Sequence, residues 1–102
     1  MQLVQILLPL YDAEGNRFAR DVFDRIARRL SERFGGATLY ARTPATGLWE
    51  KGSGETRRDD ILVCEVMVDT LDPEWWAEYR KELEHMLAQD EVVIRSQEMT
   101  RL

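Results

Sequence analysis

Two segments of this chain carry apolar residues at helical spacing, and each has a single apolar stripe. The stripe within residues 17–34 contains Phe18, Val22, Phe23, Ile26, Ala27, Leu30 and Phe34. The stripe within residues 73–87 contains Trp75, Trp76, Tyr79, Leu83, Met86 and Leu87. A helix with one apolar stripe buries only one side, so both predicted helices must pack against the same core from outside.

Four further segments are typical of β-strands: residues 2–8, 37–43, 60–69 and 91–99. The predicted order is therefore strand, helix, strand, strand, helix, strand, which is the split β-α-β pattern of ferredoxin-like folds. The sequence predicts an α+β, ferredoxin-like βαββαβ fold, with a four-stranded antiparallel sheet and two helices on one face. By analogy with that fold, the first and third strands lie in the middle of the sheet.

The ends of the predicted helices are marked by capping residues. Asn16 suits an N-cap, so the first helix is expected to begin near Arg17, and Gly35-Gly36 suits its C-terminal end. Asp72 and Pro73 suit the start of the second helix. Residues 46–55 are interpreted as a hairpin that turns at 52–54, with a loop as the alternative.

Length and charge limit the classes of function. A chain of 102 residues is expected to form one compact domain, residues 1–102. Nineteen acidic against fourteen basic residues give a net charge of −5, which disfavours binding to nucleic acid or an anionic membrane surface. No run approaches the roughly 20 apolar residues of a membrane-spanning helix. The lone Cys64 fits a reducing compartment, so a cytoplasmic location is expected.

Period-two alternation separates the two faces of the predicted sheet. The more apolar set, assigned to the helices, contains Val4, Ile6, Leu8, Leu62, Cys64, Val66 and Val68. The opposite, open face contains Leu3, Gln5, Leu7, Thr38, Tyr40, Arg42, Ile61, Val63, Glu65, Met67, Val93, Arg95 and Gln97. A polar cluster of Gln5, Tyr40, Arg42, Glu65 and Arg95 is therefore expected on an apolar background.

Glu65 is the most informative member of this cluster, because a carboxylate between Val63 and Met67 must be hydrated, paired or protonated. The same face would expose Leu3, Leu7, Ile61, Val63 and Met67 together, and soluble monomers seldom leave such a patch bare. One expected cover is a second copy of the chain, with Glu65 paired to Arg95 or Arg42. The alternative is a small-molecule pocket closed by Trp49 or Tyr11.

The other chemically notable residues are interpreted structurally. His85 is expected to face solvent without partners for metal binding or catalysis. Cys64 is expected to be a small core residue. Trp75, Trp76 and Tyr79 are expected to anchor the core. No cofactor or metal is expected, and the third strand lacks the aromatic side chains on which RNA-binding domains stack bases.

Four segments carry a resemblance to known proteins: LPLYD at 8–12, RFGG at 33–36, GLW at 47–49 and DDILVCEVMV at 59–68. Through them the chain resembles a group of small bacterial conserved hypothetical proteins, which implies the fold but no activity. More distantly, its architecture is similar to the dimeric α+β barrel proteins, in which two such domains pair sheet to sheet. That resemblance implies a homodimer.

Some of these barrel proteins are cofactor-independent monooxygenases and some degrade haem. The haem-degrading members have a polar residue on the first strand, an aromatic residue on the third and a cavity-facing histidine on the second helix. Gln5 matches the first of these, whereas the third strand has no aromatic residue and His85 points away. The resemblance therefore implies a dimer more than it implies haem chemistry.

Two hypotheses follow for the function. The first is a homodimeric binding or interaction module whose open sheet face forms a dimer interface or a ligand cavity. The second is a cofactor-independent small-molecule enzyme, monooxygenase- or isomerase-like, with Glu65 as general base and Tyr40 or Arg42 as orienting groups.

Overall fold

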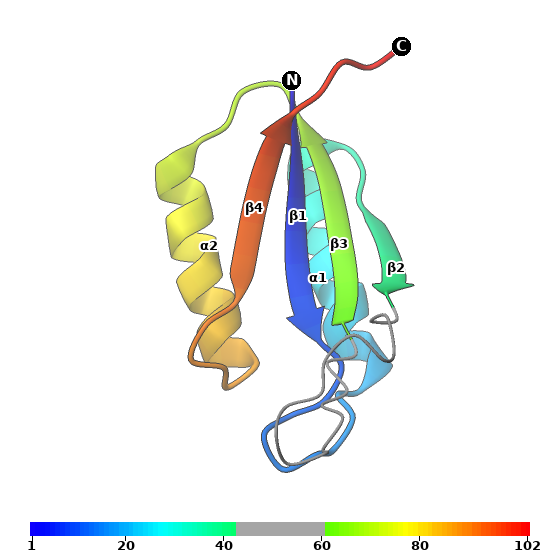
Figure 1. The fold of residues 1–102 in the computed structure, drawn as a ribbon, viewed down its shortest axis with the longest axis vertical. Coiled ribbons are helices and arrows are strands. Elements are labelled where there is room, and N and C mark those ends of the chain that lie inside the picture. Colours follow the sequence, from blue (N-terminus) through cyan, green and yellow to red (C-terminus); the bar gives the residue numbers. More distant parts are fainter. Residues whose placement is uncertain (43–60) are drawn as a thin grey trace, which may run out of the picture.

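The computed structural model describes residues 1–42 and 61–102. Along the chain its elements are β1 (Gln2–Pro9), α1 (Arg20–Phe34), β2 (Thr38–Arg42), β3 (Ile61–Val68), α2 (Pro73–Met86) and β4 (Val93–Glu98), shown in Figure 1. The hairpin expected at 46–55 and the candidate residue Trp49 lie outside the described residues.

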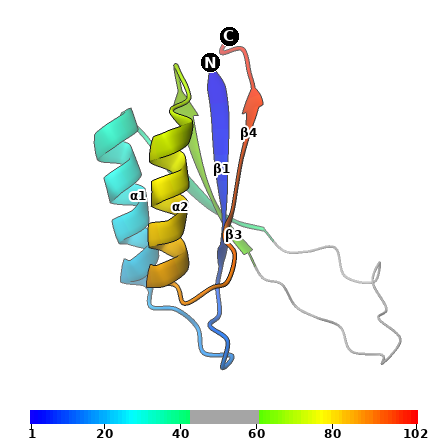
Figure 2. The ribbon, with the colours of Figure 1, turned by 90° about the vertical axis from the view of Figure 1, so that its left-hand side faces the viewer.

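The four strands form one antiparallel sheet in the order β2-β3-β1-β4. Both helices lie on the same side of this sheet, as Figure 2 shows. The ferredoxin-like βαββαβ fold predicted from the sequence is confirmed, together with the central position of β1 and β3. No helix in the described part of the chain is long and apolar enough to cross a membrane.

The core lies between the sheet and the helix layer. Its buried residues are Val4, Ile6, Leu8, Phe23, Ile26, Leu30, Cys64, Val66, Val68, Trp76, Tyr79, Leu83, Leu87 and Val92. The strand residues in this set alternate along β1 and β3, as the assignment of the helix-facing side predicted. Leu62 belongs to the same side and packs half-buried against the core.

Helix α1 begins at Arg20, so the expected start near Arg17 with Asn16 as the cap is wrong. The reason is a turn built around Asp12, whose carboxylate accepts hydrogen bonds from the backbone N–H groups of Glu14 at 3.0 Å and Asn16 at 2.8 Å. The Phe18 N–H then donates to the Leu10 carbonyl at 3.0 Å. These bonds hold residues 10–18 in a closed loop, and the helix starts only after it.

The other predicted helix ends are confirmed. Gly35 closes α1 with φ of 85°, and its N–H donates to the Ser31 carbonyl at 2.8 Å. Asp72 caps α2 by accepting a hydrogen bond from the Trp75 N–H at 3.2 Å. Together these caps bring the end of α1 beside the start of α2, where the rings of Phe34 and Trp76 stack with centroids 5.3 Å apart.

Candidate functional site

A row of polar side chains crosses the open face of the sheet. Gln5 on β1 lies opposite Glu65 on β3 and opposite Arg95 on β4. Glu65 in turn lies opposite Thr38 on β2. The residues Thr38, Glu65, Gln5 and Arg95 therefore occupy one register position on the four strands, and we call them the polar row. Period-two alternation predicted this face correctly, and strand register brings the residues side by side.

Hydrogen bonds join Arg95, Gln5 and Glu65, and in each bond the donor lies on the strand nearer to β4. The Nε of Arg95 donates to Oε1 of Gln5 at 2.9 Å. The Nε2 of Gln5 donates to Oε2 of Glu65 at 2.8 Å and makes a longer contact of 3.4 Å with the Tyr40 hydroxyl. Because Arg95 occupies the carbonyl end of the Gln5 amide, the NH₂ end is directed towards Glu65. Arg95 thus positions Gln5, and Gln5 positions the carboxylate.

The polar row is only partly shielded from solvent. Within the row, Gln5 and Glu65 are half-buried, whereas Thr38 and Arg95 are exposed; Tyr40, outside the row, is exposed as well. Among residues 1–42 and 61–102, Glu65 forms no ion pair, since Arg95 reaches Gln5 instead. Arg42, at the end of β2, lies opposite Ile61 on β3.

Apolar side chains surround the polar row on the same face. Leu3 and Leu7 are half-buried, Met67 is 44% exposed and Val93 is 45% exposed. The expectation that Val63 is exposed with them is wrong, because its side chain is only 1% accessible. Its register partners Leu7 and Tyr40 flank it on the two neighbouring strands. The exposed apolar surface is therefore smaller than the sequence pattern suggested, but it is still present around Glu65.

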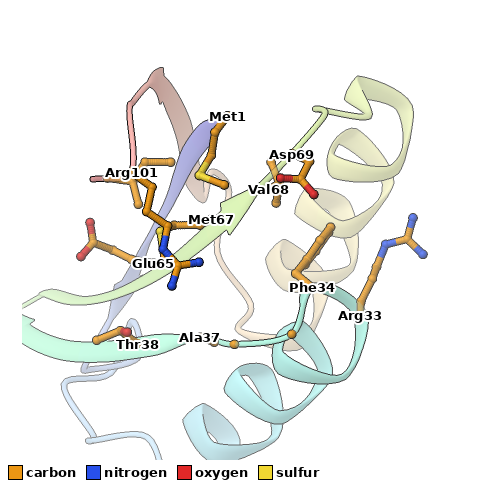
Figure 3. Close-up of a pocket in the computed structure, with 13 residues that line it drawn as sticks. Met1, Arg33, Phe34, Ala37, Thr38, Glu65, Met67, Val68, Asp69 and Arg101 are labelled. Atoms are coloured by element: carbon orange, nitrogen blue, oxygen red, sulfur yellow. The ribbon is translucent and has the colours of Figure 1, made fainter.

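An open depression of about 760 Å³ lies beside Glu65, at the end of the sheet where β2 begins. Figure 3 shows the side chains that line it. They come from the start of β1, the end of α1, the start of β2, the end of β3 and the C-terminal tail: Met1, Leu3, Arg33, Phe34, Gly35, Gly36, Ala37, Thr38, Glu65, Met67, Val68, Asp69 and Arg101.

This depression exists because β3 is longer than the part of it that β2 covers. β2 pairs with β3 only at Ile61–Glu65, whereas β3 continues to Val68 alongside β1. Every second residue of an antiparallel strand directs both its N–H and C=O groups to the same side, so the uncovered end of β3 presents backbone polar groups to the depression. Residue periodicity did not predict this site, although the unequal lengths of the second and third predicted strands were a signal.

The lining combines apolar and charged groups that suit a small organic ligand. Leu3, Phe34 and Met67 supply apolar contacts. Arg33 is partly engaged, because its guanidinium lies 4.5 Å from the centre of the Trp75 ring. Glu65 lines the edge of the depression, and its carboxylate is directed to Gln5 on β1. A few oriented polar groups on an apolar surface are the usual composition of a ligand site.

Cys64 and His85 lie where the sequence predicted them, in the core and at the surface respectively. Cys64 faces the helix layer and is fully buried; burial, with a smaller contribution from the charge of Glu65, raises the pKa of its thiol to about 11. His85 is exposed on α2. Within the described residues, no three His, Cys, Asp or Glu side chains are grouped closely enough to hold a metal ion.

Comparisons with known proteins add information on the fold. No protein-family model and no curated protein matches the chain. Among solved structures, a phage SAM lyase in complex with S-methyl-5′-thioadenosine is similar with a TM-score of 0.62 and 18% identity, covering 95% of this chain and 80% of that one. A phage SAM lyase in its apo state is similar with a TM-score of 0.60 and 14% identity, and the match covers 94% of this chain and 78% of that one. At these identities the likeness shows the fold, and the resemblances to the bacterial group and the barrel proteins stay predictions.

Proposed function

We propose that this protein is a homodimeric binding module: a second copy covers the open sheet face, and the depression beside Glu65 holds a small organic molecule. The observation that carries the proposal is the polar row itself. A hydrogen-bonded series from Arg95 through Gln5 to Glu65 is fixed in orientation on a face that is otherwise apolar. Such an arrangement suits recognition of a partner or ligand better than contact with water alone.

Self-association is supported by the side chains around that row. Met67 and Val93 are each more than two-fifths exposed, and Leu3 and Leu7 are only half-buried. No described helix or strand covers this face, since α1 and α2 both lie on the other one (Figure 2). Contiguous apolar surface of this kind is characteristic of interaction sites.

Small-molecule binding is supported by the depression and by a structural neighbour. The open depression has the volume of typical ligand pockets, and its lining includes apolar side chains and Glu65. A protein of the same fold, the phage SAM lyase, binds S-methyl-5′-thioadenosine. That compound is therefore a suitable first probe.

The ligand site is tested by titrating ¹⁵N-labelled protein with S-methyl-5′-thioadenosine and following amide shifts. The proposal predicts shifts at residues 1–3, 36–38 and 65–69. Met67→Gln is expected to weaken binding, because Met67 lines the depression. Met86→Gln is the matched control, since Met86 is equally exposed, at 45%, but lies on α2. No shifts with this probe, together with no retained small molecule in native mass spectrometry, would contradict the ligand-binding part of the proposal.

A second candidate is a cofactor-independent enzyme that uses Glu65 as general base, of the monooxygenase or isomerase type. Two observations support an enzyme in general: a hydrogen bond from Gln5 fixes the Glu65 carboxylate next to the depression, and two solved structures of similar fold are of a phage SAM lyase. The variant Glu65→Gln distinguishes a binding module from an enzyme. It preserves shape and hydrogen bonding but removes the base, so an enzyme would lose turnover while retaining ligand. Consumption of SAM, followed chromatographically, is the first activity to assay.

A further inference from the structure

We propose that the second copy docks with a two-fold axis running along β1, so that Glu65 of each protomer contacts the partner's Arg95. This inference rests on the proposed self-association and specifies its geometry. It follows from the order of charges in the polar row. Glu65 and Arg95 flank Gln5 on either side, each one strand away from β1.

The positions of these charges discriminate between the possible two-fold axes. A two-fold axis in the plane between the sheets, parallel to the strands and above Gln5, places β3 over the partner's β4. Glu65 then lies over the partner's Arg95, and the symmetry forms this pair twice. An axis perpendicular to the strands and passing over the polar row places Glu65 over the partner's Glu65, which is repulsive. Only the first arrangement makes the face self-complementary in charge.

The two side chains also have unused hydrogen-bonding capacity that matches. Arg95 uses Nε for Gln5, and its two terminal nitrogens make no hydrogen bond within residues 1–42 and 61–102. Glu65 uses Oε2 for Gln5, and Oε1 accepts no hydrogen bond in that same part of the chain. Covering a half-buried carboxylate without supplying a cation is costly, so an apolar partner alone would be disfavoured. The partner's Arg95 supplies the cation.

The distances that sheet packing requires are compatible with this contact. Packed sheets lie about 10 Å apart, a gap that facing Glu and Arg side chains span together. Packed sheets also rotate relative to each other by about 30°. At about 4.8 Å from the axis this rotation displaces the two residues by roughly 2.5 Å. The long Arg95 side chain accommodates that displacement.

The same arrangement predicts a weak interface, which leaves uncovered only the side of the depression that β2 forms at Thr38. β3, β1 and β4 overlap their partner strands, whereas β2 extends beyond the interface with Thr38 and Tyr40. The three overlapping strands give a footprint of roughly 350 Å² per protomer. Their corrugated side chains would bury on the order of 1,000 Å² in total, which is the lower limit for a specific interface. A reversible dimer is therefore expected.

The test reverses each charge and then recombines the variants, with sedimentation equilibrium as the readout. Glu65→Arg and Arg95→Glu are each expected to weaken the homodimer at least about tenfold, because each places like charges opposite each other twice. An equimolar mixture of the two variants is expected to dimerise at least about tenfold more tightly than either alone, since both mixed pairs attract. Glu98→Arg is the matched control, because Glu98 lies on β4 with its side chain on the opposite face.

Each outcome has a distinct meaning. Rescue in the mixture, with Glu98→Arg unchanged, supports the docking geometry. Single variants that dimerise like the wild type, or a mixture without rescue, would overturn the geometry while the proposed self-association stands. A wild-type protein that stays monomeric would overturn both. Circular dichroism confirms that each variant is folded before it is measured.

Discussion

Replacing Tyr79 by Phe tests how much stability the protein loses through a buried hydroxyl group that has no hydrogen-bond partner. The Tyr79 side chain is only 2% exposed, and its hydroxyl has no hydrogen-bond partner in the described part of the chain. A buried polar group without a partner costs about 1–3 kcal/mol. Phe keeps the ring that stacks on Trp75 at 5.1 Å, so Tyr79→Phe is expected to raise the free energy of unfolding by about 1 kcal/mol at pH 7.

The pH dependence of this difference provides a second readout. Burial raises the pKa of Tyr79 from 10 to about 12 in the folded protein. Between these values the unfolded chain releases the proton and the folded chain retains it, so wild-type stability falls as the pH rises above 10. Phe cannot titrate. The advantage of the variant is therefore expected to grow by about 1 kcal/mol between pH 9 and pH 11.

The assay is guanidinium unfolding at both pH values, followed by tryptophan fluorescence. Tyr11→Phe serves as the control, because Tyr11 is 39% exposed and its replacement should change the free energy of unfolding by less than about 0.5 kcal/mol. If Tyr79→Phe is less stable than the wild type by 1 kcal/mol or more, or if the difference in stability does not depend on pH, the buried Tyr79 hydroxyl does not carry the cost assigned to it.

Three further predictions concern single residues. Cys64 is buried and its pKa is raised, so it is expected not to react with 5,5′-dithiobis(2-nitrobenzoic acid) at pH 8 until urea unfolds the protein. Rapid labelling of the native state would contradict its burial. Asp72→Ala removes the cap on the Trp75 N–H and should lower the free energy of unfolding by about 1 kcal/mol in urea titrations, whereas an unchanged midpoint would argue against the cap. Gly35→Ala forces a side chain into a backbone with φ of 85° and should cost about 1 kcal/mol by the same measurement; an equally stable variant would contradict that conformation.

The sequence was sufficient to predict the fold because its local signals agree with one another. The single apolar stripe of each helix required both helices on one sheet face, and alternation along β1 and β3 identified which face. Asp72 and Gly35 marked helix ends through their own capping chemistry. The start of α1 was predicted wrongly because Asp12 forms its hydrogen bonds with the following turn, a competition that residue preferences alone do not reveal.

Three members of the polar row were predicted from the sequence, but their connectivity and the depression were not. Alternation placed Gln5, Glu65 and Arg95 on one face, but only strand register shows that Gln5 lies between the other two. Burial of Val63 depends on neighbours from two other strands, and the depression depends on where β2 stops covering β3. These features arise from pairings between segments that are distant in the sequence. The periodicity of a single strand gives no information about such pairings.

Methyl NMR on dilution shows whether a second copy covers the open sheet face. Spectra are recorded at about 500 µM and about 20 µM, a range that brackets the weak dissociation constant expected from the small interface. If the face is covered by a second copy, we expect concentration-dependent shifts for the methyl groups of Leu3, Leu7, Met67 and Val93, and none for Met86 on α2. Shifts confined to Met86, or none anywhere, would contradict it.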